Sequence, residues 1–214
     1  MNPPSPLAPS VDANVEPMRG GDLAPDRKVR HIPGEAGLWV LLFGDMVIFT
    51  ILFCVYLSRR GADEALFASS QDHLNRTLGG VNTLVLLTSS VLIVFAVRAF
   101  RNERTRYLTP RLMVAGLAVG ACFVVVKAFE YHQKIAAGLT PTTNDFYMWY
   151  YAITGLHLAH VVLGLVILSV LTRVVATKPQ PTSTNIAFLE GGACFWHLVD
   201  LLWIVIFPLI YLVR

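Results

Sequence analysis

The sequence predicts an all-α integral membrane protein, a bundle of five transmembrane helices with a disordered N-terminal tail. Of its 214 residues, 55% are hydrophobic and only 14% are charged, and the mean hydropathy is +0.57. The apolar residues gather in five long runs, whereas seven of the twelve prolines precede residue 34. Soluble domains carry about 25% charged residues, so this composition excludes an ordinary soluble domain.

Residues 1–33 form the first predicted segment, a disordered cytoplasmic tail. This stretch contains no apolar run of signal-peptide length, and its proline-rich composition cannot bury enough apolar surface to fold. The membrane domain is expected over residues 34–214.

Five apolar runs approach or exceed the roughly 20 helical residues that cross a hydrocarbon core about 30 Å thick. They lie at about residues 37–57, 80–97, 112–129, 148–172 and 189–213. Outside these runs, eleven Lys and Arg residues fall on the side of the N-terminal tail and five on the opposite side. The positive-inside rule therefore places the N-terminus in the cytoplasm and the C-terminus outside.

The first two runs carry polar residues at membrane depth. Asp45 lies about 12 Å into the first run at 1.5 Å per residue, on one face with Phe49 and Tyr56. A buried carboxylate either pairs with another group or takes up a proton, because desolvation disfavours its charged form, and the sequence leaves both open. Asn82 and Ser89 in the second run are expected to hydrogen-bond across a helix interface.

The third run ends in a group of polar residues spaced three and four apart: Lys127, Glu130, Tyr131 and Lys134. Such spacing lets a helix satisfy its charges locally, so we expect a polar cluster at the helix end.

Histidines and an aspartate lie inside the last two runs. His157, His160 and Gly164 share one face of the fourth, and His197 and Asp200 share one face of the fifth. A central Asp costs roughly 2.5 to 3.5 kcal/mol on translocon scales, so these faces should turn inward. An intramembrane polar seam, structural or proton-related, is predicted to contain Asp45, His157, His160, His197 and Asp200.

No catalytic residue and no metal site are predicted. The three cysteines lie singly in separate apolar runs, and no CxxC or mixed Cys/His cluster is present. The net charge of +3 follows from the membrane topology, and no nucleic-acid partner is expected.

Motifs on several predicted helices together resemble subunit III of haem-copper oxidases. They are the Gly34–Trp39 stretch with Glu35, Gly44-Asp45-Met46, Glu130-Tyr131, the His157–Gly164 stripe, and Trp196 to Trp203 after Glu190. The likeness covers about residues 34–214. Residues 134–144 favour the five-helix form associated with nitric oxide reductase clusters.

The resemblance implies an accessory subunit of a respiratory complex, with no redox centre or cofactor of its own. Such a subunit supports assembly, binds structural phospholipid and sustains turnover in the bacterial inner membrane. Its expected partner is catalytic subunit I of a haem-copper oxidase or nitric oxide reductase, with haem and copper or iron on that partner. Seven-helix relatives have two further N-terminal helices that help to form a lipid-holding cleft, and they usually carry glutamate where Asp45 stands.

Two other functions stay open on the sequence alone. A membrane haem-b anchor would use His197 with His157 or His160 as axial ligands. A proton-coupled carrier would use the intramembrane Asp and His residues as a relay, although the inverted repeats and broken helices common in transporters are not evident.

Overall fold

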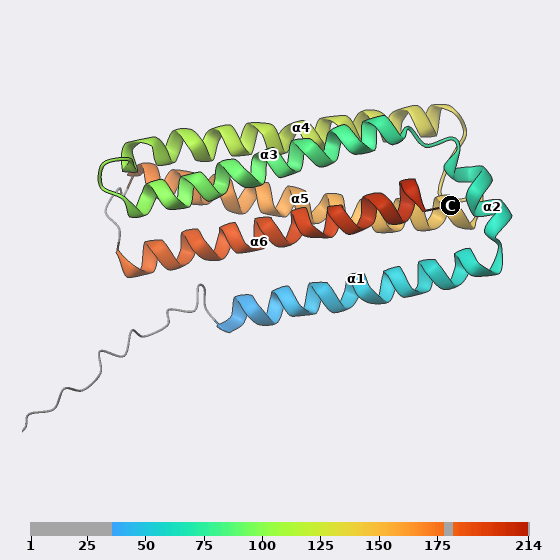
Figure 1. The fold of residues 1–214 in the computed structure, drawn as a ribbon, viewed down its shortest axis with the longest axis horizontal. Helices are drawn as coiled ribbons and strands as arrows, with labels where there is room; N and C mark the ends of the chain where they lie inside the picture. The colour runs from blue at the N-terminus through green and yellow to red at the C-terminus, as the bar shows by residue number, and fades with distance from the viewer. Residues whose placement is uncertain (1–35, 178–181, 214) are drawn as a thin grey trace, which may run out of the picture. The chain divides into compact units, whose positions relative to one another are not determined.

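The five predicted spans are helices in the computed structural model, which describes residues 36–177 and 182–213. They are α1 (Ala36–Ala62), α3 (Arg76–Arg101), α4 (Thr109–Ala136), α5 (Asp145–Thr177) and α6 (Ser183–Phe207), and they run side by side (Figure 1). Each is long and apolar enough to cross a membrane, which confirms the five-span prediction. The predicted tail and Glu35 lie outside the described residues.

Four helices extend at both ends beyond the apolar runs that predicted them, whereas α6 begins earlier than its run and ends at Phe207, before the predicted end at residue 213. The helices have 25 to 33 residues, or about 37 to 50 Å at 1.5 Å per residue, against a hydrocarbon core about 30 Å thick. The added turns are polar, such as Arg76 to Gly79 at the start of α3 and Ser183 to Phe188 at the start of α6. Hydropathy underestimates the length of these helices because the added turns are polar, as suits the headgroup region.

A short helix that the sequence analysis missed, α2 (Glu64–Gln71), joins α1 to α3. Its N-cap is Asp63, whose side chain accepts a hydrogen bond from the amide of Leu66 at 3.1 Å. At its other end Gln71 donates to the carbonyl of Ile210 at 2.9 Å. Eight residues with little periodicity leave no pattern that predicts such a helix.

Local signals set the helix ends. Asn75 and Thr182 cap α3 and α6 through their side chains, as such residues commonly do. The 3₁₀ turn η1 (Arg106–Leu108) leads into α4, which has a proline in its first turn. Gly138 follows α4 with a φ of +76°, a conformation that favours glycine after a helix.

Close packing at glycines brings α4, α5 and α6 together. A Cβ on Gly120 of α4 would lie 2.8 Å from the ring of Trp196, and a Cβ on Gly164 of α5 would lie 2.7 Å from the same ring. Trp196 of α6 therefore fills the space that two glycines leave free, and it is fully buried. Small residues at such contacts are the usual basis of helix association in membranes.

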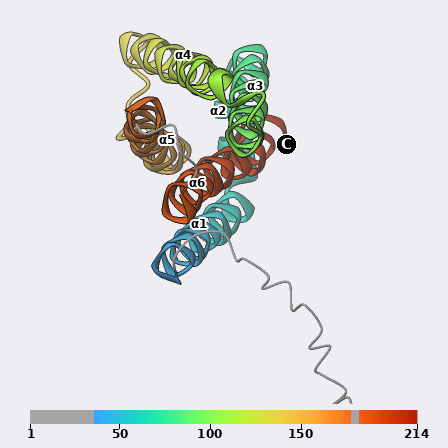
Figure 2. The same cartoon turned by 90° about the vertical axis from the view of Figure 1, so that its left-hand side faces the viewer.

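Helix α1 lies beside α5 and α6 at the edge of the bundle (Figure 2). Its buried apolar residues are Leu42, Phe49 and Tyr56, spaced seven apart on one stripe, as the face shared by Asp45, Phe49 and Tyr56 predicts. Much of the rest of α1 is exposed and apolar, including Val40, Phe43 and Val47.

Helix α6 ends at Phe207, where a π-helical turn, η2 (Pro208–Leu212), begins. Ile210 and Tyr211 of η2 are buried. The side chain of Tyr211 therefore lies inside the bundle, although it follows the end of α6.

Candidate functional site

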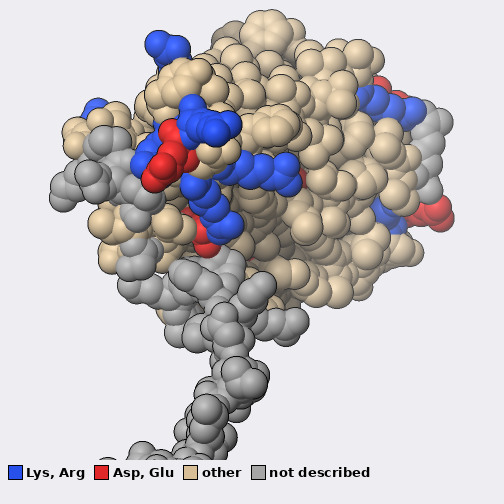
Figure 3. Space-filling view, turned by 60° about the vertical axis from the view of Figure 1, so that its left-hand side comes forward, with Lys and Arg blue, Asp and Glu red and all other residues tan. Residues whose placement is uncertain are grey.

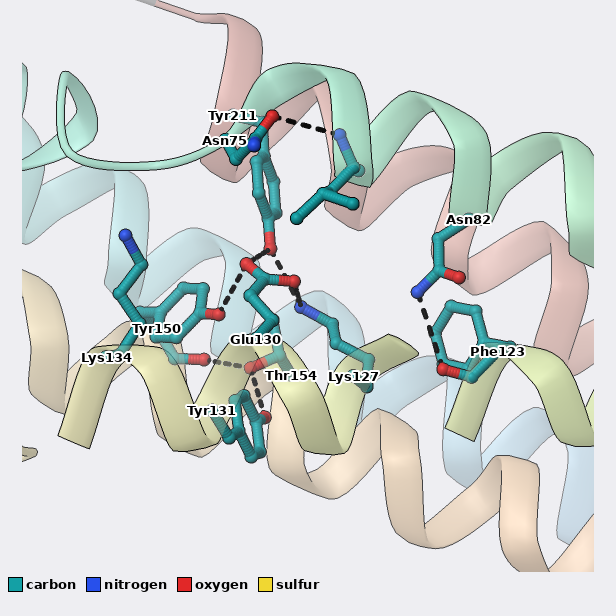
Figure 4. A network of polar contacts seen from close by, with 12 residues as sticks. Asn75, Asn82, Phe123, Lys127, Glu130, Tyr131, Lys134, Tyr150, Thr154 and Tyr211 are labelled. Atoms are coloured by element: carbon teal, nitrogen blue, oxygen red, sulfur yellow. Dashed lines mark hydrogen bonds and ion pairs between the residues drawn. The ribbon is translucent and has the colours of Figure 1, made fainter. Parts of the chain in front are cut away.

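A buried lysine–glutamate pair lies at the centre of a polar network inside the bundle (Figure 4). Lys127 and Glu130 are one turn apart on α4 and are only 1% and 2% exposed. Nζ of Lys127 is 3.1 Å from Oε2 of Glu130. Charges this deep are costly unless they are paired and hydrogen-bonded, and here one helix carries both members of the pair.

Tyrosines from two other elements complete the hydrogen bonds of this pair. The Tyr211 hydroxyl accepts from Nζ of Lys127 at 2.7 Å and donates to Oε1 of Glu130 at 2.6 Å. Tyr150 of α5 donates to the same oxygen at 2.8 Å. Nζ also lies 5.0 to 5.5 Å from four ring centroids, within cation–π range: those of Tyr131, Tyr150, Trp203 and Tyr211. The network thus joins α4, α5 and η2.

The arrangement differs from the helix-end cluster that the spacing predicts. Lys127 and Glu130 do pair locally, but tyrosines from elsewhere in the chain enclose them. The Tyr131 hydroxyl pairs with Thr154 at 2.6 Å. Lys134 donates to the carbonyl of His73 and not to Glu130, whose Oε1 already accepts from two tyrosines.

The imidazole ring of His157 packs against aromatic rings where α4, α5 and α6 meet. It is fully buried, it stacks on Trp203 with centroids 5.1 Å apart, and it meets the edge of Phe123 at 5.7 Å. Neither ring nitrogen has a hydrogen-bond partner within the described part of the chain. Trp203 donates from Nε1 to the Thr83 hydroxyl at 3.0 Å, which ties α6 to α3.

His197 and Asp200 of α6 share Ser90 of α3 as their polar neighbour. The Ser90 hydroxyl is 2.6 Å from Nδ1 of His197, and it lies close to the carboxylate of Asp200 without a hydrogen bond to it. That carboxylate is 3% exposed, and its oxygens have no partner of hydrogen-bond geometry among residues 36–177 and 182–213. His197 and Asp200 thus lie on one inward face, but they do not bond to each other.

Asp45 of α1 contacts His160 of α5. Oδ1 is 3.4 Å from Nε2, and the two side chains are 15% and 17% exposed. Nδ1 of His160 is 2.8 Å from the Leu156 carbonyl, which only accepts, so Nδ1 carries a proton. The contact between Nε2 and the carboxylate therefore links α1 to α5 through two side chains that both lie within the bundle.

The structure places the predicted seam residues in separate groups. Asp45 meets His160 between α1 and α5, His197 and Asp200 meet Ser90 between α6 and α3, and His157 packs on Trp203 near the Lys127 network. Among the described residues, no hydrogen bond connects one group to the next. Each group therefore joins particular helices, and the described hydrogen bonds form no continuous path.

Other predicted residues act at interfaces. Asn82 and Ser89 donate to carbonyls of α4, those of Phe123 at 3.5 Å and Gly116 at 2.8 Å, as their position predicts. Glu190 accepts from Nε of Arg101 at 3.1 Å and links the end of α3 to α6.

Three members of the site are not among the residues that the sequence predicts: Ser90, Tyr150 and Tyr211. One signal was present for Ser90: it lies seven residues after Thr83, so two hydroxyls that bond to α6 share one face of α3. The aromatic run at residues 146–151 has a composition typical of a membrane interface, whereas Tyr150 is fully buried.

In the described part of the chain, no group of three His, Cys, Asp or Glu residues lies close enough to hold a metal ion. The polar groups bind helix to helix, and two of these contacts pair a basic side chain with a carboxylate: Lys127 with Glu130, and His160 with Asp45.

Comparison with known proteins gives one consistent result. The family model described as cytochrome c oxidase subunit III matches residues 31–213. Cytochrome c oxidase subunit 3 of Synechocystis sp. is 34% identical over 92% of this chain and 88% of its own length. Cytochrome bo(3) ubiquinol oxidase subunit 3 of Pseudomonas putida is 30% identical over 82% and 84%. Cytochrome c oxidase subunit 3 of Corynebacterium diphtheriae is 31% identical over 84% and 88%.

Proposed function

Since the chain belongs to the cytochrome c oxidase subunit III family, we propose that it is an accessory membrane subunit of a respiratory haem-copper oxidase, without a redox centre of its own. The family match over residues 31–213, which contains all five spans, carries this proposal. Electron transfer and oxygen chemistry would belong to metal centres on the partner.

In this role the polar groups fasten the bundle together. Asp45 and His160 join α1 to α5, Ser90 and His197 join α3 to α6, and the Lys127 network joins α4, α5 and η2. The chain would then offer its partner a rigid surface, and this favours the accessory role over a haem-b anchor or a carrier.

The finer assignments extend the same proposal. We place catalytic subunit I as the direct partner, structural phospholipid as a second one, and the N-terminus in the cytoplasm. The relatives named above are oxidase subunits, so the oxidase is the partner we propose. Association with a nitric oxide reductase stays a prediction that rests on residues 134–144.

Affinity purification tests the proposal. The tagged full chain, extracted in mild detergent from cells that express the whole complex, should retain a larger haem-containing subunit, and its mass spectrum would identify an oxidase or a reductase. An unrelated tagged membrane protein is the control. Recovery of the chain alone would overturn the proposal, and a Soret band from the chain purified by itself would favour the haem-b anchor.

A further inference from the structure

A cavity of about 240 Å³ lies where the turn before α4 meets the end of α5. Its lining consists of Arg106, Tyr107, Pro110, Val175 and Ala176. At about 30 Å³ per water molecule, the volume equals roughly eight waters, which is room for a phosphate and its glycerol. Arg106 and Tyr107 contribute polar groups to the lining, and Pro110, Val175 and Ala176 are apolar.

Arg106 lines this cavity, and a bond to the backbone holds its side chain. Its Nε donates to the Phe100 carbonyl at 3.1 Å, near the end of α3. That bond uses one of the five guanidinium hydrogens, so the two Nη groups remain for a ligand. An arginine fixed in this way presents the fork geometry that matches a phosphate.

The surrounding end of the bundle is strongly basic. Six arginines and two glutamates occupy it among the described residues: Arg98, Arg101, Arg104, Arg106, Arg111 and Arg173, with Glu103 and Glu190. Glu190 is already bonded to Arg101. Figure 3 shows the basic side chains gathered at this end. The opposite end is balanced, with four basic and four acidic residues: Arg59, Arg60, Arg76 and Lys134, with Asp63, Glu64, Asp72 and Asp145.

We propose that this cavity holds the headgroup of one anionic phospholipid. The phosphate lies on Arg106, and the acyl chains run along the apolar side of α4 and α5 past Pro110 and Val175. Tyr107, an aromatic residue 67% exposed, lies at headgroup level, where such side chains are favoured. Basic pockets between transmembrane helices bind anionic headgroups in this way.

This inference rests on the part of the proposed function that gives the chain a lipid partner, and it names the lipid class and the site. Co-purification of the haem-containing subunit is measured separately. Normal co-purification without lipid retention would overturn the lipid site alone.

Native mass spectrometry of the detergent-purified full chain and of the complex tests the site. The probes are phosphatidylglycerol and phosphatidylcholine with the same acyl chains, and inorganic phosphate. We expect wild-type protein to retain one phosphatidylglycerol in preference to phosphatidylcholine. Loss of one basic residue near a membrane surface is worth about 1 kcal/mol, so Arg106→Gln should weaken retention about fivefold.

Ala176→Trp fills the cavity without changing the charge and should also reduce retention. Arg59→Gln, an exposed arginine at the balanced end, is the matched control and should leave retention unchanged. The proposal fails if Arg106→Gln and Ala176→Trp retain phosphatidylglycerol as wild type does, or if phosphatidylcholine is retained equally. Displacement of the lipid by millimolar inorganic phosphate would also overturn it, because the site would then be one for free phosphate.

Discussion

At the scale of single residues, each buried charge in the Lys127 network is paired with an opposite charge and hydrogen-bonded to uncharged groups. Lys127 and Glu130 neutralise each other, and tyrosine hydroxyls use the hydrogen-bonding capacity that remains. Removing one partner of such a pair leaves the other charge uncompensated, whereas removing both together costs less.

Lys127→Met and Glu130→Gln should each lower the free energy of unfolding by about 3 to 5 kcal/mol. The double variant should lose less than the sum, with a coupling of about 0.5 to 3 kcal/mol. Unfolding by dodecyl sulfate titration in detergent micelles measures both. Strict additivity would mean that the two side chains do not stabilise each other.

His197→Ala should reduce the yield of the assembled complex before it reduces turnover per complex. The variant removes the bond to Ser90 and with it a link between α6 and α3, worth about 1 kcal/mol for a hydrogen bond within a membrane. Purified yield and oxidase turnover are compared. Asp200→Asn is the contrast: it keeps the shape of a side chain whose oxygens have no hydrogen-bond partner within the described residues, and it should leave yield unchanged. If His197→Ala gave a normal yield of complex but lost turnover, the prediction that assembly is affected first would be wrong.

The sequence predicts the charged and histidine residues of the site, but it does not predict which other side chains they contact. Asp45, His197 and Asp200 stand out because a polar residue in an apolar run is conspicuous. Tyr150 and Tyr211 do not, because tyrosine is common near membrane surfaces and their bonds to Glu130 cross 20 and 81 residues of sequence. Such pairings depend on how helices pack, which no local spacing contains.

At the scale of elements, helix contacts depend on where glycine faces a large side chain. Gly164 faces the ring of Trp196, whereas a Cβ on Gly44 of α1 would meet nothing within 4 Å. The sequence places Gly164 on an inward face, but it does not say that Trp196 is the residue opposite. It also predicts the five long helices and misses α2, because only the long helices carry a strong apolar signal.

Gly164→Ala should lower the free energy of unfolding by about 1 to 3 kcal/mol, because the new methyl group overlaps the Trp196 ring. Gly44→Ala is the matched control. It should be neutral or slightly stabilising, since alanine is about 1 kcal/mol better than glycine inside an exposed helix. Thermal unfolding of the chain in detergent checks both. Equal effects of the two variants would contradict the packing that we describe around Trp196.

At the scale of the whole molecule, the two ends of the bundle differ in charge. The end where α3 meets α4 carries six arginines, and the other end is balanced. The positive-inside rule applies to such a difference directly, so the arginine-rich end should face the cytoplasm.

Single-cysteine labelling of intact cells checks this orientation. In a background with Cys54, Cys122 and Cys194 replaced by alanine, Asp72→Cys should react with a membrane-impermeant maleimide. Glu103→Cys should react only after the membrane is permeabilised. Both positions are exposed. Reversed labelling would place the N-terminus outside and disprove the assignment.

The tyrosine cage around Lys127 also has a consequence for biogenesis. Tyr211 is made 84 residues after Lys127, an interval of roughly 4 to 17 s at about 5 to 20 residues per second. During that time α4 and its lysine already exist, whereas η2 has not yet been made. Glu130, one turn away, is the counter-ion that travels with it, so the helix delivers a neutral pair to the lipid and the later helices enclose it on arrival.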